Sequence, residues 1–195
     1  MAISIENSKG KSYFVKSKKT KRGNTTYYMT KKEDGTCLSE VPNGYEVFEK
    51  FDSNVLFIRK KKKSLFDLKE INLIKSSLRN NKGLTDFRID THGKILSVYT
   101  ADKEMNERQF ESLVKPFYSR SQIDHYRSMW IKFEERMRII VHENKGDREY
   151  EVKRYCYKGA VDDWITIGVE SDIESVVKDY LIHLGRDSYY ELYGY

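Results

Sequence analysis

The stretch that decides the fold is residues 150–159, Tyr-Glu-Val-Lys-Arg-Tyr-Cys-Tyr-Lys-Gly, with residues 160–165, Ala-Val-Asp-Asp-Trp-Ile, directly after it. Aromatic and β-branched residues mixed with charged ones are typical of a long strand, and the glycine predicts its end. Tyr155 and Tyr157 should share one face of that strand and Cys156 the other, because side chains alternate along a strand. The paired aspartates then predict a short acidic turn before a buried tryptophan.

The rest of the second half can be built around this strand. Further strands are expected at residues 86–90, 95–99, 129–133, 137–141 and 164–168. The charged residues 134–136 should separate the third and fourth of these strands. Apolar spacing predicts a helix over residues 106–118 and another that begins at a Ser171 cap, followed by a final turn over residues 187–192.

The first half has the pattern of short strands joined by turns. Strands are expected at residues 13–15, 25–30, 45–49 and 55–58, separated by glycine-rich turns. Residues 65–80 then show apolar side chains at helical spacing. We take Ser64 as the N-cap of this helix, with Asp67 in the place of the usual Glu or Gln of a capping box.

These elements predict an antiparallel α+β protein. Residues 1–63 should form a small basic β-meander, residues 64–83 a connecting helix, and residues 84–195 a larger α+β unit. Length is consistent with this division, since 195 residues suffice for one domain or two small ones.

Cysteine usage and hydropathy suggest where the protein resides. Cys37 and Cys156 are the only cysteines, and the first residues show no basic segment followed by an apolar run. No stretch approaches the roughly 18 apolar residues that span a bilayer. We therefore expect a cytoplasmic protein that has no membrane partner.

Charge is distributed unevenly along the chain. Residues 1–85 hold 19 Lys and Arg against 9 Asp and Glu, whereas residues 86–195 hold 17 against 21. A clustered basic surface attracts polyanions, although lysines on a solvated surface give the same composition. The predicted contact residues are Lys18, Lys19, Lys21, Arg22, Arg59, Lys60, Lys61, Lys62 and Lys63. They flank strands that carry Tyr13, Phe14, Tyr27 and Tyr28, whose rings could stack on unpaired bases.

Signatures of catalysis are scarce. The sequence contains no phosphate-binding loop, nucleotide-binding glycine fingerprint, nucleophile elbow or His-Glu-x-x-His motif, so we predict no cofactor and no metal. Glu151-x-Lys153 fits the acid-x-Lys pattern of metal-dependent nucleases, with Asp124 or Glu135 as a possible upstream ligand. The same pattern recurs at residues 67–69 and 143–145, which is about what chance gives in so charged a chain.

Three short patterns resemble sequences of uncharacterised bacterial proteins. They are residues 41–46, Val-Pro-Asn-Gly-Tyr-Glu; residues 155–165, which begin Tyr-Cys-Tyr-Lys-Gly and end Asp-Asp-Trp-Ile; and residues 183–188, His-Leu-Gly-Arg-Asp-Ser. The resemblance touches both halves of the chain and implies a bacterial cytosolic origin. It implies no activity and transfers no catalytic or binding residue.

The function favoured by these observations is a non-enzymatic binding or accessory protein. Its basic half would contact nucleic acid or another acidic partner. One alternative is a protein–protein interaction module or homodimer that uses the acidic half and its tyrosines. Another is a metal-dependent nuclease centred on Glu151 and Lys153.

Overall fold

The computed structural model describes residues 1–101, 119, 132–144, 146–158 and 160–193. Their contacts divide the chain into two compact units, the first containing residues 1–62 and the second beginning at Lys63. Antiparallel sheets of three, two and five strands combine with helices, which confirms the α+β class.

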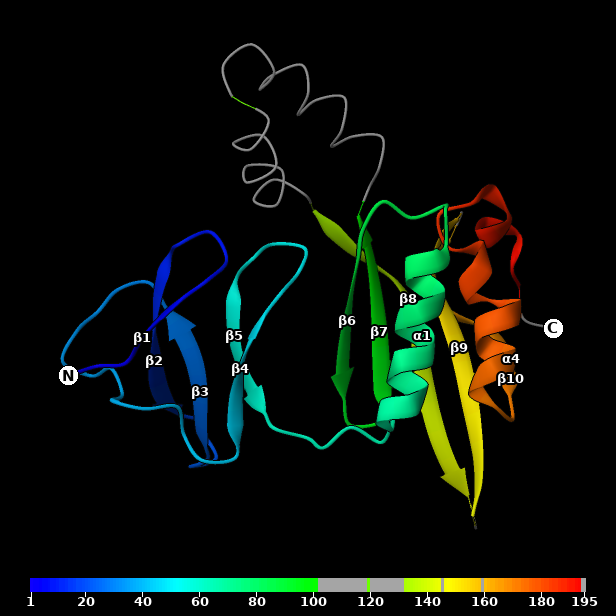
Figure 1. Cartoon of the computed structure of the whole chain (residues 1–195). Helices are drawn as coiled ribbons and strands as arrows, with labels where there is room; N and C mark the ends of the chain where they lie inside the picture. The colour runs from blue at the N-terminus through cyan, green and yellow to red at the C-terminus, as the bar shows by residue number, and fades with distance from the viewer. Residues whose placement is uncertain (102–118, 120–131, 145, 159, 194–195) are drawn as a thin grey trace. The chain divides into compact units, whose positions relative to one another are not determined.

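The first unit consists of two small antiparallel sheets (Figure 1). Strands β1 (Ser4–Glu6), β2 (Ser12–Lys19) and β3 (Thr25–Thr30) form one sheet, in that order. Strands β4 (Tyr45–Glu49) and β5 (Leu56–Lys60) form the other. Among the described residues of this unit, the buried apolar side chains are few: Tyr13, Val15 and Leu56.

Polar side chains join these two sheets at one end. The amide of Asn7 donates to the carbonyl of Asn54 over 2.6 Å, and the Asn54 amide donates to Ser8 Oγ at 3.0 Å. The carboxylate of Glu49 accepts from Ser8 and, at 3.1 Å, from Asn54. The described part of the first unit has a small apolar core, and side-chain hydrogen bonds join its two sheets.

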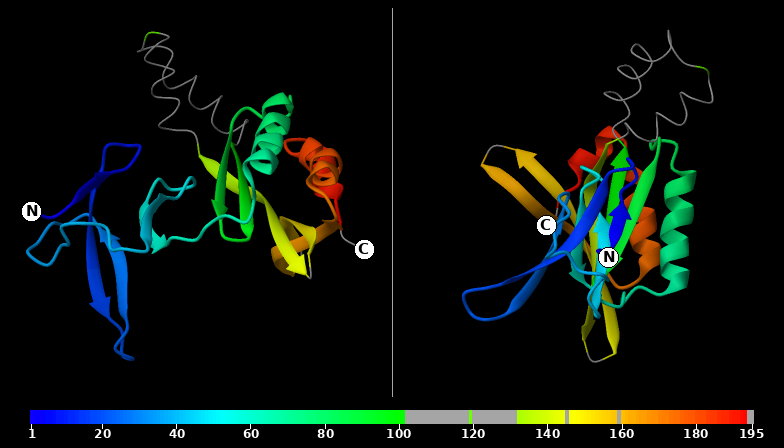
Figure 2. Two further views of the ribbon diagram at one scale, coloured as in Figure 1. Left: turned by 60° about the horizontal axis from the view of Figure 1, so that its bottom comes forward. Right: turned by 90° about the vertical axis from the view of Figure 1, so that its left-hand side faces the viewer.

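The second unit is built on one five-stranded antiparallel sheet with the strand order β10-β9-β8-β7-β6. Its strands are β6 (Phe87–His92), β7 (Ile95–Ala101), β8 (Phe133–Asn144), β9 (Asp147–Lys158) and β10 (Val161–Glu170). Helices pack on one face of this sheet, as the views in Figure 2 show. These are α1 (Leu68–Asn80), α4 (Ile173–Asp179) and the short 3₁₀ helices η1 (Leu181–His183) and η2 (Asp187–Glu191).

A continuous apolar core lies between the sheet and its helices. Leu96, Met137 and Val152 contribute from the sheet, while Ile74 and Val176 contribute from α1 and α4. All five side chains are fully buried. The predicted helix over residues 65–80 is thus confirmed from Leu68 onward, and it packs within the second unit.

Two predicted helix caps lie at the wrong residue. Asp67 caps α1, because its carboxylate accepts from the Glu70 amide while the Glu70 side chain accepts from the Asp67 amide. Such a reciprocal pair satisfies two amides that have no intrahelical partner. The Ser64 hydroxyl, predicted as the cap, accepts instead from the Phe66 amide. Asp172 likewise caps α4 in place of Ser171.

The sheet also departs from prediction in its third and fourth strands. Residues 133–144 form one continuous strand, β8, so the predicted break at residues 134–136 is wrong. Val98 and Tyr99 of β7 pair with Met137 and Glu135, which leaves Arg136 as the extra residue of a β-bulge. Charged residues are compatible with a strand here, because a bulge re-aims side chains without ending the strand. The predicted helix over residues 106–118 lies outside the described residues.

The opening stretch forms β9 and the start of β10. Tyr155 and Tyr157 are 41% and 84% exposed while Cys156 is 6% exposed, so the predicted alternation is confirmed. Trp164 is only half-buried, contrary to prediction. It pairs with Tyr155 on the face of the sheet opposite the core, where Arg138 covers its ring at 3.9 Å.

Candidate nucleic-acid interface

The first group of predicted contact residues lies around the β2–β3 hairpin. Lys18, Lys19, Lys21 and Arg22 are all exposed, and we call them the hairpin cluster. Gly23 makes the turn possible with a positive φ of 81°, which an L side chain rarely adopts. In the described part of the chain, no carboxylate forms an ion pair with any of these four side chains.

The second group lies at the end of β5. We call Arg59, Lys60, Lys61 and Lys62 the strand-end cluster. Arg59 differs from the others, because its Nε donates to Glu46 at 2.8 Å and its guanidinium lies 4.1 Å from the Phe48 ring centroid. Its charge is therefore largely compensated, whereas Lys61 and Lys62 are exposed and form no ion pair with a described residue. Lys60 is exposed as well. Lys63, the last predicted residue, belongs to the second unit.

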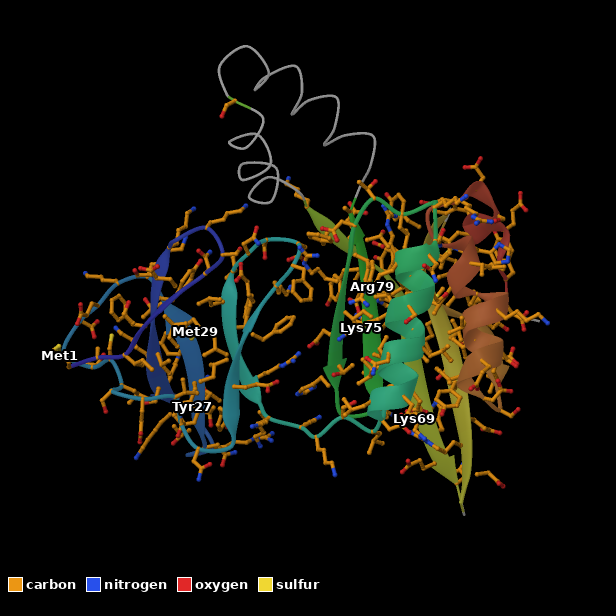
Figure 3. The ribbon with its side chains drawn as sticks, viewed as in Figure 1. Met1, Tyr27, Met29, Lys69, Lys75 and Arg79 are labelled. Atoms are coloured by element: carbon orange, nitrogen blue, oxygen red, sulfur yellow. The ribbon has the colours of Figure 1, made fainter. Side chains whose placement is uncertain are left out.

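One aromatic contact brings these two clusters to the same end of the first unit. Tyr27 on β3 and Tyr45 on β4 meet edge to face, with ring centroids 4.8 Å apart (Figure 3 marks Tyr27). Tyr27 is two residues from Thr25, which pairs with Lys19, and Tyr45 pairs directly with Lys60. The hairpin and strand-end clusters therefore adjoin, and together we call them the basic end.

The four tyrosines and phenylalanines of β2 and β3 are not equally available for stacking. Tyr13 is buried at 4% exposure, and Tyr27 is half-buried against Tyr45. Tyr28, 44% exposed, pairs across the sheet with Lys16 and so lies on the same face as Lys18. Tyr28 is therefore the most exposed of these rings, and it lies on the same strand face as an exposed lysine.

Lys16 is held in an internal ion pair. Its ammonium contacts the carboxylate of Asp34, which also accepts from the Thr36 hydroxyl at 2.6 Å. The hydrogen bond from Lys16 lowers the pKa of Asp34 well below its usual value, and the same bond raises the pKa of Lys16. Lys16 therefore contributes little free charge to the basic end.

A second basic surface, which the sequence interpretation missed, lies on the second unit. Lys75 and Arg79 follow one another by one helical turn along α1, as Figure 3 shows, and with Arg88 they line a shallow cavity of about 430 Å³. Arg88 is paired there with Asp86 at 3.0 Å. The spacing of four between Lys75 and Arg79 is the signal that could have revealed this surface.

The acidic residue of the acid-x-Lys pattern in β9 is engaged by three neighbouring side chains. Glu151 accepts from Thr166 at 2.6 Å and contacts Lys153 and His142 at 3.0 and 3.1 Å. Partial burial alone would raise the pKa of Glu151, but the bonds from Thr166, Lys153 and His142 outweigh it and lower the pKa to about 2. Asp124 lies outside the described residues, and Glu135 forms an ion pair with Arg138 at 2.7 Å.

Metal-binding geometry is absent from the described residues, where no three His, Cys, Asp or Glu side chains gather around a common point. Cys37 and Cys156 are both free thiols. Of the helices that the structure describes, none is long and apolar enough to cross a membrane.

Comparison with known proteins adds no functional information. No protein-family model matches the chain, and neither a curated protein nor a solved structure shows significant similarity to it. The chemistry of the described residues is therefore the basis for assigning a function.

Proposed function

We propose that this protein is a non-enzymatic, cytoplasmic nucleic-acid-binding protein that contacts the phosphate backbone through the basic end of its first unit. The observation that carries the proposal is the Tyr27–Tyr45 contact, which brings the hairpin and strand-end clusters together. Among the described residues, six cations of the basic end form no ion pair: Lys18, Lys19, Lys21, Arg22, Lys61 and Lys62. Such a group of cations is favourable beside a chain of phosphates, since binding releases condensed counterions.

The residue types favour contact that does not depend on base sequence. Lysine binds phosphate as a point charge, whereas bidentate reading of a base edge favours arginine. Arg59 is already engaged by Glu46, which leaves Arg22 as the exposed arginine of the basic end. Tyr28 adds a ring on which an unpaired base can stack, so we propose single-stranded nucleic acid as the preferred form.

The salt dependence of binding tests this proposal. Affinity for a fluorescent single-stranded oligonucleotide is measured between 50 and 200 mM salt, since each phosphate contact contributes about 0.7 to the slope of log K against log salt. Replacing Lys18, Lys19 and Lys21 together by alanine should reduce the slope by about 2. All three are exposed, so the variant should fold normally.

A matched control lies at the opposite end of the same sheets. Lys9, Lys11 and Lys50 lie beside the Asn7–Asn54 link, so their replacement by alanine removes the same charge far from the basic end. That variant should keep nearly the full slope. Equal losses of slope in the two variants would show that binding depends on net charge alone and not on the basic end. The absence of binding at 50 mM salt would refute the proposal.

A further inference from the structure

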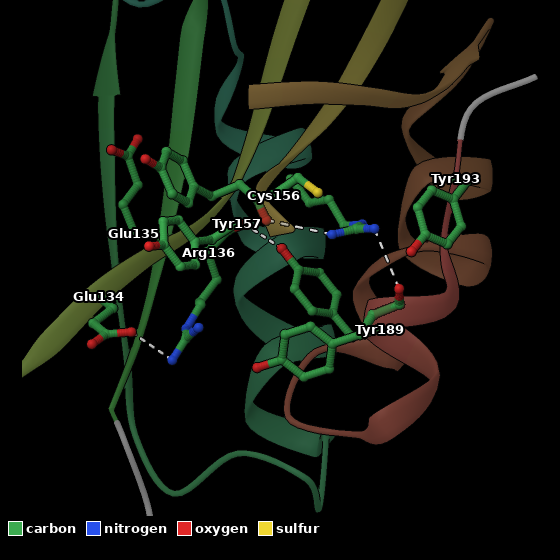
Figure 4. A pocket seen from close by; sticks show the side chains of 10 residues that line it. Glu134, Glu135, Arg136, Cys156, Tyr157, Tyr189 and Tyr193 are labelled. Carbon is green, nitrogen blue, oxygen red and sulfur yellow. Dashed lines mark hydrogen bonds and ion pairs between the residues drawn. The ribbon is translucent and has the colours of Figure 1, made fainter. Parts of the chain in front are cut away.

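The second unit contains a pocket beside the C-terminal segment, and no residue of the basic end lines it. Its volume is about 320 Å³, and it is lined by residues of β8, of β9 and of the segment from η2 to Tyr193 (Figure 4). A cavity of this size matches the lower end of the range for small-molecule sites. Tyrosine rings make up much of its wall.

The buried cation of this pocket is Arg154. It lies on the core face of β9, between the buried residues Val152 and Cys156, and is 3% exposed. The strand register pairs it with Met137 and Ile165, so its neighbours across the sheet are apolar. Burial of a charge is costly unless the charge is paired and hydrogen-bonded.

Main-chain carbonyls are the partners that the structure gives to Arg154. Its Nε donates to the Leu192 carbonyl at 2.7 Å, and its two terminal nitrogens donate to the carbonyls of Tyr190 and Tyr155 at 3.3 and 3.4 Å. The last two distances exceed the usual 2.9–3.0 Å. A guanidinium has five N–H donors, so three bonds leave two unused. Within the described residues, no carboxylate lies within ion-pair distance of Arg154.

The other charged groups of the pocket neutralise one another. Arg136 forms an ion pair with Glu134 at 2.5 Å, and Figure 4 shows this pair at the wall. Glu135 binds the fork of Arg138 at 2.7 and 2.8 Å. Among the described residues, the positive charge of Arg154 is left without a counter-charge. A monoanion balances it, whereas a dianion would introduce an excess negative charge beside Glu134 and Glu135.

Aromatic side chains define the shape of the ligand. Tyr189 is fixed in place, since its hydroxyl donates to the carbonyl of the bulge residue Arg136, and burial raises the pKa of Tyr189 so that it stays neutral. The rings of Tyr190 and Tyr193 are about half exposed, and Tyr193 lies 4.8 Å from the Arg154 guanidinium. Flat walls of this kind favour a flat ligand.

We propose that this pocket binds a small planar carboxylate, such as an aryl carboxylic acid, with its carboxylate on Arg154 and its ring against the lining residues Tyr190 and Tyr193. A carboxylate is planar and matches the fork of a guanidinium. The proposal is independent of nucleic-acid binding, because it uses no residue of the first unit.

A purely structural role for Arg154 is the alternative, in which it fastens the carbonyls of the C-terminal segment to β9. The two roles are separated by titrating the full chain with benzoate and with its neutral isostere benzamide, while tyrosine resonances and the melting temperature are recorded. Benzoate should bind about tenfold more tightly than benzamide, since an ionised acceptor strengthens the hydrogen bonds. Equal binding of the two compounds, or no binding of either, would overturn the proposal.

Two variants complete the test. Arg154→Lys keeps the charge but loses the planar fork, and it should weaken benzoate binding about tenfold. Tyr190→Ala alters an exposed ring, so it should fold normally and still weaken benzoate and benzamide alike. The variant with alanine at Lys18, Lys19 and Lys21 should bind benzoate as the unaltered chain does. Benzoate binding that both pocket variants leave unchanged, or that the lysine variant abolishes, would contradict the assignment.

Discussion

The two units are stabilised by different interactions. Among residues 1–62 of the first unit, Tyr13, Val15 and Leu56 are the buried apolar side chains, and polar links such as Asn7–Asn54 join its sheets. In the second unit a continuous core joins five strands to α1 and α4. Their surfaces differ as well: residues 1–62 carry 14 Lys and Arg against 7 Asp and Glu, and residues 63–195 carry 22 against 23. A small unit can therefore keep most of its lysines exposed while hydrogen bonds supplement its core.

The largest effect of a single polar substitution is expected in the second unit, at Glu70. This carboxylate is 7% exposed, accepts from Arg148 at 3.0 Å and from the Tyr150 hydroxyl, and completes the capping box of α1. Glu70→Ala leaves the Arg148 cation without its buried partner, so it should lower the free energy of unfolding by about 3 kcal/mol. Urea denaturation followed by circular dichroism measures this loss.

Glu174 offers the matched control, because it is an exposed glutamate in the first turn of α4. Glu174→Ala should cost about 0.5 kcal/mol, the value of a charge near a helix end. Similar losses in the two variants would show that Glu70 does not join α1 to β9 as described. Below its melting temperature, the Glu70 variant should still bind the oligonucleotide, since the basic end is intact.

A smaller effect is expected in the first unit, at Asn54. Its φ of 54° lies in the left-handed region, and its side chain bonds to Ser8 and Glu49. Asn54→Ala removes these hydrogen bonds and places alanine in a strained backbone conformation, so it should destabilise the first unit by about 2 kcal/mol. Asn54→Gly keeps the backbone freedom and should cost less. Hydrogen exchange of the β2 and β5 amides measures the effect in this unit, and equal exchange in the two variants would contradict the role of the backbone.

The smallest effect concerns pH and Glu151. The pKa of Glu151 is lowered from 4.5 to about 2 in the folded chain, so the unfolded chain takes up the proton first as the pH falls. The stability contributed by Glu151 is therefore present in full above pH 4.5 and is lost toward pH 2. The free energy of unfolding is measured by urea denaturation at both pH values. That of Glu151→Gln should lie below that of the unaltered chain at the higher pH and approach it at the lower. If the difference in the free energy of unfolding is the same at both pH values, the network does not lower the pKa of Glu151 as described.

Periodicity and turn residues predicted most of the elements, because both depend on local sequence. The helix over residues 65–80 was recognisable from its apolar spacing, and the alternation of Tyr155, Cys156 and Tyr157 showed which side chains face the core. The cap at Asp67 was missed because Ser64 also has a capping side chain. A competition between two such residues is decided by backbone geometry.

The candidate sites were harder to predict, because they depend on contacts between distant segments. Both lysine clusters were visible in the sequence, but their proximity follows from the Tyr27–Tyr45 contact, which no local pattern indicates. Arg154 was hidden for another reason. A charged residue in a strand is ordinarily expected on the solvated face. Arg154 lies instead on the core face, where it donates hydrogen bonds to the carbonyls of Tyr190 and Leu192.

Nuclear magnetic resonance of the full chain tests the contrast between the two units most directly. Amide shifts are recorded while a short single-stranded oligonucleotide is added at low salt. We predict that the largest changes fall on the basic end, at Lys18, Lys19, Lys61 and Lys62 and at the neighbouring Tyr28. Changes centred instead on the second unit, around Lys75 and Arg79 or around Arg154, would contradict the assignment of polyanion binding to the first unit.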